Sequence, residues 1–274
     1  MKFIHLTDTH LSSEPLYGID THARLAAALE HIKKRADGAL FAVVTGDIAQ
    51  AGDVDSYREA ARMFAELPMP VFVLPGNHDN EEHFAQVFAR ADDVLLPSGG
   101  DIPAPLAPAK VSAPDFEAVF FNTAQRGKAA GRVREDELAA LEALLSRPDP
   151  RPLLIFMHHP PFASGIAAMD AAGLENAGDL ARVLQMGVRK ASGIFCGHLH
   201  RTISGLWAGT SVSCLRAVAH EVAPDVHGSV MTGTVEAPEY ALVEVEKTNK
   251  EEGAGVSILS QTMRFTEGFE RFCL

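Results

Sequence analysis

Short apolar runs alternate with amphipathic stretches over the first two thirds of the chain, and this alternation limits the possible folds most strongly. The apolar runs predict five buried strands, at Lys2–Thr7, Leu40–Thr45, Val71–Leu74, Leu153–Met157 and Gly193–Cys196, with a further strand at Phe116–Asn122. The amphipathic stretches predict helices at Asp20–Ala36, Asp53–Leu67, Glu81–Ala91, Arg134–Ser146 and Asp179–Lys190. Strands and helices that alternate in this way form βαβ units around a largely parallel inner sheet. The sequence therefore predicts the α/β fold class.

The last third of the chain has a different pattern, without a long helix. Strands joined by turns are predicted at Thr202–Leu206, Gly209–Ser213, Tyr240–Lys247 and Val256–Gln261. Nearer the middle, Leu96–Pro108 is rich in Pro and Gly and is expected to be a surface loop. We divide the chain into a core at 1–213 and a β-rich C-terminal region at 214–274, which either completes a second sheet or forms a cap or oligomer contact.

Composition and charge limit the cellular compartment in which the protein is expected and the kinds of partner that it can bind. Three widely spaced cysteines cannot form a disulfide framework, and no apolar run approaches the ~18 residues of a membrane span. We therefore expect a cytoplasmic protein with no membrane contact. The chain has 24 Lys and Arg against 36 Asp and Glu, a formal net charge of −12, and it lacks the basic cluster with which proteins bind nucleic acid polymers. An anionic substrate would need a local source of positive charge.

Residues of the types that bind metals directly follow each of the five strands. They form the clusters Asp8-Thr9-His10, Gly46-Asp47, Gly76-Asn77-His78-Asp79, His158-His159 and Gly197-His198-Leu199-His200. Each cluster alone is compatible with an ordinary turn. In α/β sheets, however, the loops at the carboxyl ends of the strands converge in space, so we expect these five loops to meet. Oxygen and imidazole donors without thiolate suit Fe, Mn, Co or Zn better than copper, calcium or magnesium.

In their order along the chain, these clusters resemble the five signature blocks of the calcineurin-like metallophosphoesterase family. The blocks are Asp8-x-His10, Gly46-Asp47, Gly76-Asn77-His78-Asp79, His158 and Gly197-His198-x-His200, so the resemblance spans roughly residues 1–205. It implies a four-layer αββα sandwich, in which two mixed β-sheets pack face to face with helices outside. It also implies a two-metal centre at one edge of the sandwich.

The resemblance further implies a role for each residue of the clusters. One metal ion would be held by Asp8, His10 and His200, and the other by Asn77, His158 and His198, with Asp47 as the bridging ligand. His78 is not a ligand in the family pattern, and we expect it to donate a hydrogen bond or a proton to the phosphoryl group or the leaving oxygen, with Asp79 fixing its orientation. His159 is either a group behind the ligands or a packing residue.

A two-metal centre would let this acidic chain act on an anionic phosphodiester. Two cations about 3.5–4 Å apart hold a bridging hydroxide and offset negative charge during its in-line attack on phosphorus. Two divalent ions, two aspartates and one hydroxide leave a net charge of about +1 in the pocket. We therefore predict a metal-dependent phosphoric diester hydrolase with two divalent or trivalent transition metal ions (Fe, Mn, Zn or Co).

Departures from the protein phosphatases of the family favour a diester substrate over a monoester. The segment 48–52 after Asp47 reads Ile-Ala-Gln-Ala-Gly and lacks the arginine that those phosphatases carry there, so a doubly charged monoester would lose a bidentate partner. The string at 156–162 (Phe-Met-His-His-Pro-Pro-Phe) and the segment 16–20 resemble the bacterial class III cyclic-nucleotide phosphodiesterases and glycerophosphodiesterases.

A small phosphodiester is therefore the expected partner, with a 3',5'-cyclic nucleotide such as cyclic AMP favoured. A glycerophosphodiester, or another small diester or phosphonate ester, is the alternative. The predicted substrate pocket comprises Asn77, His78, Tyr17, Phe162 and His220. A metal-free binding scaffold and a nuclease are hypotheses of other classes, which metal analysis and salt-dependent binding to single-stranded DNA would distinguish. Because strand-rich C-terminal regions supply dimer contacts in proteins of this resemblance, we expect a homodimer or a higher homo-oligomer.

Overall fold

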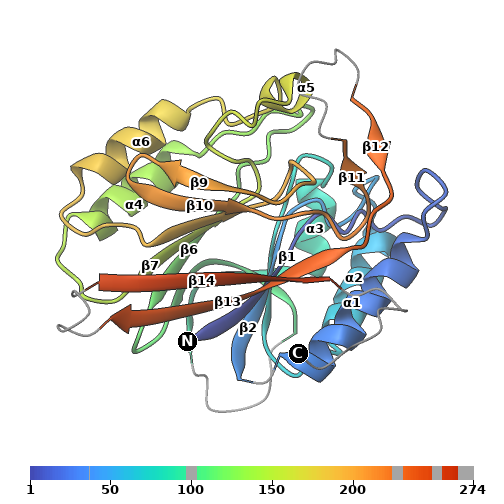
Figure 1. Cartoon of the computed structure of the whole chain (residues 1–274), viewed down its shortest axis with the longest axis horizontal. Helices are drawn as coiled ribbons and strands as arrows, with labels where there is room; N and C mark the ends of the chain where they lie inside the picture. Colours follow the sequence, from blue (N-terminus) through green and yellow to red (C-terminus); the bar gives the residue numbers. More distant parts are fainter. Residues whose placement is uncertain (37, 97–103, 224–230, 249–254, 265–274) are drawn as a thin grey trace, which may run out of the picture.

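The structure, a computed structural model, describes residues 1–36, 38–96, 104–223, 231–248 and 255–264. It has the predicted α/β architecture, with most strands in one large mixed sheet and helices in two groups (Figure 1). The order of strands across this sheet is β14-β13-β1-β2-β3-β5-β6-β7-β8-β10-β9, and β4 pairs with β5. No helix among the described residues is long and apolar enough to span a bilayer.

The N-terminal half of the sheet is parallel and carries three helices. Its elements are β1 (Lys2–Leu6), α1 (Thr21–Arg35), β2 (Ala39–Thr45), α2 (Val54–Phe64), β3 (Val71–Leu74) and α3 (Glu81–Val87). The helices start where side chains of Asp20, Asp53 and Asn80 accept hydrogen bonds from their first-turn N–H groups. Leu29 of α1 and Phe64 of α2 pack with Val44 of β2 in one buried cluster, so these helices cover this face of the sheet.

The second half of the sheet repeats the arrangement with another group of helices. Its elements are β6 (Glu117–Phe121), α4 (Glu135–Leu145), β7 (Leu153–Met157), α5 (Ala167–Asp170), α6 (Ala177–Met186) and β8 (Gly193–Cys196). Strand β7 lies parallel to both β6 and β8. Leu141 of α4 and Leu180 of α6 pack with Ile155 of β7 in a second buried cluster. The predicted helices and strands of both halves are thus present, although α2 and α6 end earlier than predicted, at Phe64 and Met186.

The join between the two halves differs from the prediction. Helix α3 ends at Val87, short of the predicted Ala91, and the chain continues as β4 (Ala89–Leu95). Strand β5 (Leu106–Ser112) begins inside the predicted surface loop Leu96–Pro108, of which residues 97–103 lie outside the described part of the chain. Strand β5 pairs with β3 at a single position and runs antiparallel to β6. Because this pairing connects the halves, one curled sheet replaces the two separate sheets that were expected.

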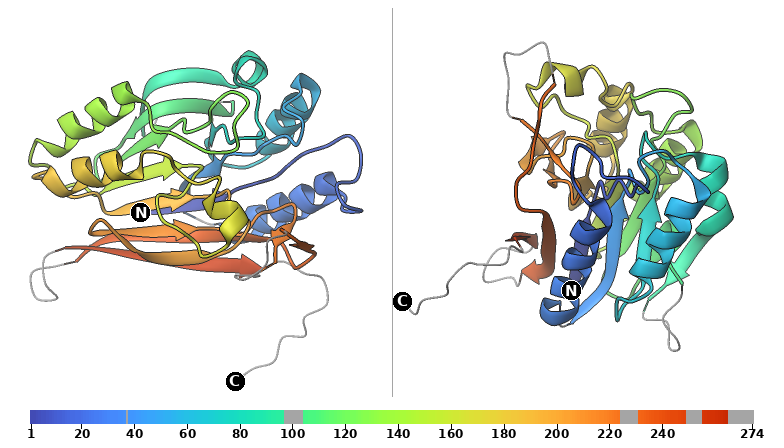
Figure 2. Two further views of the ribbon diagram at one scale, coloured as in Figure 1. Left: turned by 90° about the horizontal axis from the view of Figure 1, so that it is seen from above. Right: turned by 90° about the vertical axis from the view of Figure 1, so that its right-hand side faces the viewer.

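The last third of the chain adds strands at both ends of the large sheet and forms a separate two-stranded sheet from β11 and β12. Its elements are β9 (Ile203–Trp207), β10 (Thr210–Cys214), β11 (Glu221–Val222), β12 (Gly233–Thr234), β13 (Glu239–Thr248) and β14 (Gly255–Arg264). Strand β10 extends the sheet from β8, and β13 lies antiparallel to β1. The predicted strands of the last third are confirmed, and β13 and β14 complete the sheet beside β1. Figure 2 shows these two strands, in red, as one layer along the bottom of the left view.

The curled sheet encloses an inner core in which phenylalanine rings pack among aliphatic side chains. Phe3 stacks on Phe41 with ring centroids 5.2 Å apart, and its edge meets Phe156 and Phe195 at 5.4 and 5.1 Å. This core lies on the face of the strands that the helices do not cover, so the layers follow the predicted order of helices, strands, strands and helices. Within each half, the parallel strands bring their carboxyl ends to one edge of the sheet.

Candidate metal centre

The loops that follow β1, β2, β7 and β8 are tied together by backbone hydrogen bonds. The N–H of Asp8 donates to Gly46 O (3.1 Å), and the N–H of His10 donates to Asp47 O (2.9 Å). Across the sheet, the N–H of Gly197 donates to His158 O at 3.1 Å. Segments far apart in sequence therefore meet at one edge, as the strand-end pattern predicts.

One group of side chains brings four donor atoms together. Asp8, His10, Asp47 and His200 are buried, and one ligand atom of each lies within 4.8 Å of the others. The Nε2 atoms of His10 and His200 are 3.1 Å apart, and His200 Nε2 is 3.3 Å from Asp8 Oδ1. Nitrogen and carboxylate donors that face one another at this spacing could hold a metal ion.

A second group lies on the other side of Asp47. Its Asn77 Oδ1 is 3.1 Å from His158 Nε2 and 2.9 Å from His198 Nδ1. Asp47 Oδ2 is 3.4 Å from His158 Nε2 and 3.5 Å from His10 Nε2, so this one oxygen lies within reach of both groups. The structure thus brings all seven predicted ligands together, in the two sets that the family pattern implies.

Hydrogen bonds behind the site fix the histidine rings and their tautomers. The Nδ1 of His158 lies 2.8 Å from Thr45 O, and the Nδ1 of His200 lies 2.8 Å from His220 O. A backbone carbonyl only accepts, so each Nδ1 carries a proton and it is Nε2 that faces the site. His10 Nδ1 makes the equivalent contact with the side chain of Gln50, at 2.7 Å.

Charge and burial act in opposite directions on the acidic ligands. Burial disfavours ionisation of Asp47, yet the neighbouring charge of His158 holds the pKa of its carboxyl well below the usual range. His158 responds in the opposite sense: burial lowers its pKa, but the charge and hydrogen bond of Asp47, together with Asp8 and the Thr45 carbonyl, raise it to about 10. Burial lowers the pKa of His198 to about 3. The ionised Asp47 and the neutral His198 are in the protonation states that metal ions bind, whereas His158 would have to release its Nε2 proton to bind a cation.

His78 lies at the open side of the site. Its side chain is exposed, its ring centroid is 4.8 Å from that of His10, and its N–H donates to Asp47 Oδ1 at 2.9 Å. Its ring Nδ1 contacts Gln50 O at 3.3 Å. The expected partner Asp79 does not hold the ring of His78. The Asp79 carboxylate accepts hydrogen bonds from backbone N–H groups of both neighbouring loops and from a tyrosine hydroxyl (Ile48, Ala49, Gly76 and Tyr57).

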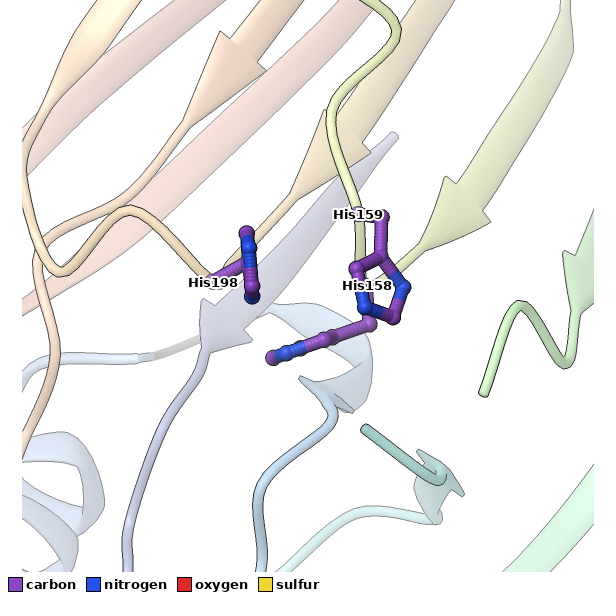
Figure 3. Close-up of side chains that lie close together, drawn as sticks. All are labelled: His158, His159 and His198. Carbon is purple, nitrogen blue, oxygen red and sulfur yellow. The ribbon is translucent and has the colours of Figure 1, made fainter. Parts of the chain in front are cut away.

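His159 lies behind the donor atoms. With His158 and His198 it forms a group of three imidazoles (Figure 3). Both of its ring nitrogens are already occupied by protein: Nδ1 is 2.8 Å from Thr123 Oγ1, and Nε2 is 3.0 Å from Ala129 O. Of the two predicted roles, the contacts favour a group that lies behind the ligands.

The predicted pocket residues divide into two places. Tyr17 is 78% exposed and contacts the ring of His220 at 5.2 Å, and His220 in turn lies 4.5 Å from His200. These two rings therefore border the metal centre. Phe162 instead packs, partly buried, against the apolar cluster beneath α4 and α6, and its role in substrate binding stays a prediction.

Sequence reasoning missed several residues that support the site. Thr7 Oγ1 donates to Asp8 Oδ2 at 2.6 Å, Gln50 holds His10, and Thr123 holds His159. Two of them could have been found from their positions at strand ends, since Thr7 is the last residue of one predicted strand and Thr123 directly follows another.

A buried set of oxygen and nitrogen donors at the carboxyl edge of a curled α/β sheet defines a candidate metalloenzyme. The chain belongs to the calcineurin-like phosphoesterase family, whose model matches residues 1–202. This match confirms the resemblance, and with it the expectation of an enzyme that uses divalent metal ions to cleave phosphoesters.

Relatives and a solved structure agree with this membership. A probable cyclic nucleotide phosphodiesterase of Rhodopseudomonas palustris is 37% identical over 255 residues, which cover 90% of this chain and 89% of that protein. The glycerophosphodiester phosphodiesterase GpdQ of Enterobacter lignolyticus is 31% identical over 230 residues, or 81% of this chain and 79% of that protein. A dimetal phosphatase of Danio rerio matches with a TM-score of 0.58 at 14% identity, covers 97% of this chain and 99% of its own, and has the same fold.

Proposed function

We propose that this chain is a dinuclear-metal phosphodiesterase that hydrolyses a small phosphodiester, with a 3',5'-cyclic nucleotide such as cyclic AMP as the favoured substrate. The observation that carries the proposal is the position of Asp47 Oδ2, which lies 3.5 Å from His10 Nε2 and 3.4 Å from His158 Nε2. A carboxylate oxygen that lies within reach of an imidazole nitrogen from each ligand set is suited to bridge two cations. Transition metal ions such as Mn, Fe, Zn or Co fit donors of this kind.

The residues divide between two ions as the family pattern implies. Asp8, His10 and His200 would hold one ion, Asn77, His158 and His198 would hold the other, and Asp47 lies within reach of both sets. When bound, the two ions supply Lewis-acid chemistry, since they activate water and offset the charge of phosphoryl oxygens. With two divalent ions bound, the charge of Asp8 and Asp47 would be more than offset, so the site would attract an anion although the whole chain has a net charge of −12.

His78 is the proposed general acid or hydrogen-bond donor toward the leaving oxygen. Its exposed ring lies beside His10, and its backbone N–H and Nδ1 are held by Asp47 and Gln50. The Nε2 atom has no protein partner among the residues that the structure describes, so it is available to the substrate. A positioned imidazole that protonates a leaving alkoxide typically contributes about 10²–10⁴ in rate.

The Tyr17 and His220 rings support the preference for a nucleotide. Tyr17 is largely exposed beside His220, so a nucleobase has an aromatic surface on which to stack next to the phosphoryl site. The relative from Rhodopseudomonas palustris is named for cyclic nucleotides, whereas the relative from Enterobacter lignolyticus is named for glycerophosphodiesters. A glycerophosphodiester is therefore the second candidate substrate.

The test is a substrate panel with Mn-loaded protein: cyclic AMP, glycerophosphoethanolamine, bis(p-nitrophenyl) phosphate and p-nitrophenyl phosphate. We expect turnover of the diesters, with the highest kcat/KM for cyclic AMP. Hydrolysis of the monoester without turnover of any diester would overturn the assignment. Metal analysis of the purified protein tests the scaffold hypothesis, because a scaffold would carry no stoichiometric metal and Asp47→Ala would leave its partner binding unchanged.

We also propose that the protein is a cytoplasmic homodimer or higher homo-oligomer. The edge strand β14 supports an oligomer, since it exposes Val256 and Leu259 and has no charged residue from Gly255 to Met263. Light scattering at several protein concentrations tests the oligomeric state, and a monomer at all concentrations would contradict it.

A further inference from the structure

The four histidines of the proposed centre are not held in the same way. His158 and His200 each donate from the nitrogen that faces away from the site to a backbone carbonyl, and His10 contacts the Gln50 side chain. His198 uses Nδ1 toward Asn77, while its Nε2 is buried and has no hydrogen-bond partner among the described residues. Since no hydrogen bond holds the nitrogen that faces away from Asn77, packing must contribute to the orientation of the His198 ring.

The ring that packs against His198 most closely is that of His159. The two ring centroids are 4.6 Å apart with an interplanar angle of 47°, and His159 also meets His158 edge-on at 4.8 Å. His159 is completely buried, and Figure 3 shows it beside the other two rings at the ends of β7 and β8. A neutral aromatic ring in this place limits the rotation of the His198 imidazole about its χ2 bond.

His159 is itself fixed from behind. Its Nε2 donates to the Ala129 carbonyl at 3.0 Å, so its Nδ1 is the acceptor of the Thr123 hydroxyl at 2.8 Å. The backbone of Gly131 lies so close that a Cβ there would overlap the His159 ring. Gly131 is in turn held by hydrogen bonds with Gly173 and Glu175 at 3.1 and 2.8 Å.

We infer that His159 is a positioning residue for His198, which it orients by ring packing where the other ligand histidines are oriented by a hydrogen bond. The inference rests on the proposed dinuclear centre. His159 is not a ligand itself, because both of its nitrogens are bonded to protein. Since it contacts His158 and His198 but none of the ligands of the first ion, its loss acts on the second site.

The experiment measures metal binding, independently of turnover. The variants are His159→Ala, which removes the ring, and Thr123→Val, which removes only the hydroxyl that holds it. Their matched controls are His5→Ala and Thr123→Ser. His5 is a buried histidine bonded to a threonine hydroxyl (Thr45, 2.8 Å), and serine keeps the hydroxyl at 123. Each protein is titrated with Mn(II) at equilibrium, and the Co(II)-substituted form is followed by its visible absorption.

Wild-type protein is expected to bind two ions. In His159→Ala, one ion should bind with unchanged affinity and the other 10- to 100-fold more weakly, the usual loss when a group behind a metal ligand is removed. Thr123→Val should show a smaller loss at the same site, and both controls should match the wild type. The inference fails if both variants bind two ions with wild-type affinity, or if His5→Ala loses the same ion. A wild-type chain that binds fewer than two ions refutes the dinuclear centre instead.

Discussion

Replacement of Gly197 by alanine tests the close approach of the loop after β8 to the end of β1. A Cβ at this position would overlap Thr7 Oγ1 and lie 2.6 Å from Asp8 Oδ2 and 3.0 Å from Thr45 O. The Thr7 hydroxyl is hydrogen-bonded to both of these oxygens, so none of the three atoms can move without loss of a bond. Overpacking costs about 1–3 kcal/mol, and a buried hydroxyl left unpaired costs about 1–3 kcal/mol more. We expect the free energy of unfolding to fall by about 2–6 kcal/mol.

Urea denaturation in the presence of EDTA measures this loss without a contribution from metal. The matched control is Gly205→Ala in β9, where a Cβ would meet nothing within 4 Å, and its stability should stay within about 0.5 kcal/mol of wild type. The double variant Gly197→Ala, Thr7→Ala should lose less stability than the sum of the single variants, because the second change removes the atom that overlaps. Gly197→Ala with the stability of Gly205→Ala would refute the reasoning.

Three further predictions concern the proposed chemistry. His78→Ala should lower kcat by about 10²–10⁴ with unchanged Mn content, because the side chain is exposed and is not a proposed ligand; an unchanged kcat excludes it as the acid. Tyr17→Ala should raise KM for cyclic AMP by about 5- to 100-fold, the range of base stacking, and leave KM for glycerophosphoethanolamine unchanged; equal changes would contradict the stacking role. EDTA should lower the midpoint of thermal unfolding. Ions that bind only the folded state stabilise it by about 2.7 kcal/mol per site when their concentration is a hundredfold above Kd. An unchanged midpoint would argue against buried ions.

The donor residues could be predicted because their positions follow from a rule of topology. Parallel strands share one carboxyl edge, so Asp8, Asp47 and His158 must approach each other once the strands are recognised. The residues behind the donors follow no such rule. Gln50 binds His10 through a loop conformation, and His159 is fixed by a carbonyl whose position depends on how the loop at 123–131 folds. Contacts with backbone atoms leave little trace in a single sequence.

The errors in the fold have a similar origin. Strand β4 has an exposed pattern with two adjacent aspartates, so neither its alternation nor its composition indicates a strand. It forms because β5 offers an edge with which it pairs over most of its length. The union of the two halves into one sheet depends on a single pairing, Phe72 with Leu106, which no local pattern encodes.

Backbone strain in this structure is concentrated at the proposed ligands. Five of the seven lie in the left-handed region, with φ between 41° and 69° (Asp8, His10, Asp47, His198 and His200). Each such residue costs about 1–2 kcal/mol, and five of them cost about as much as the net stability of a typical domain. A free loop could not carry this cost, so the conformation of the ligands must be imposed by the hydrogen bonds between neighbouring loops and by the aromatic core behind them. The same hydrogen bonds and core packing therefore hold the donor atoms close together.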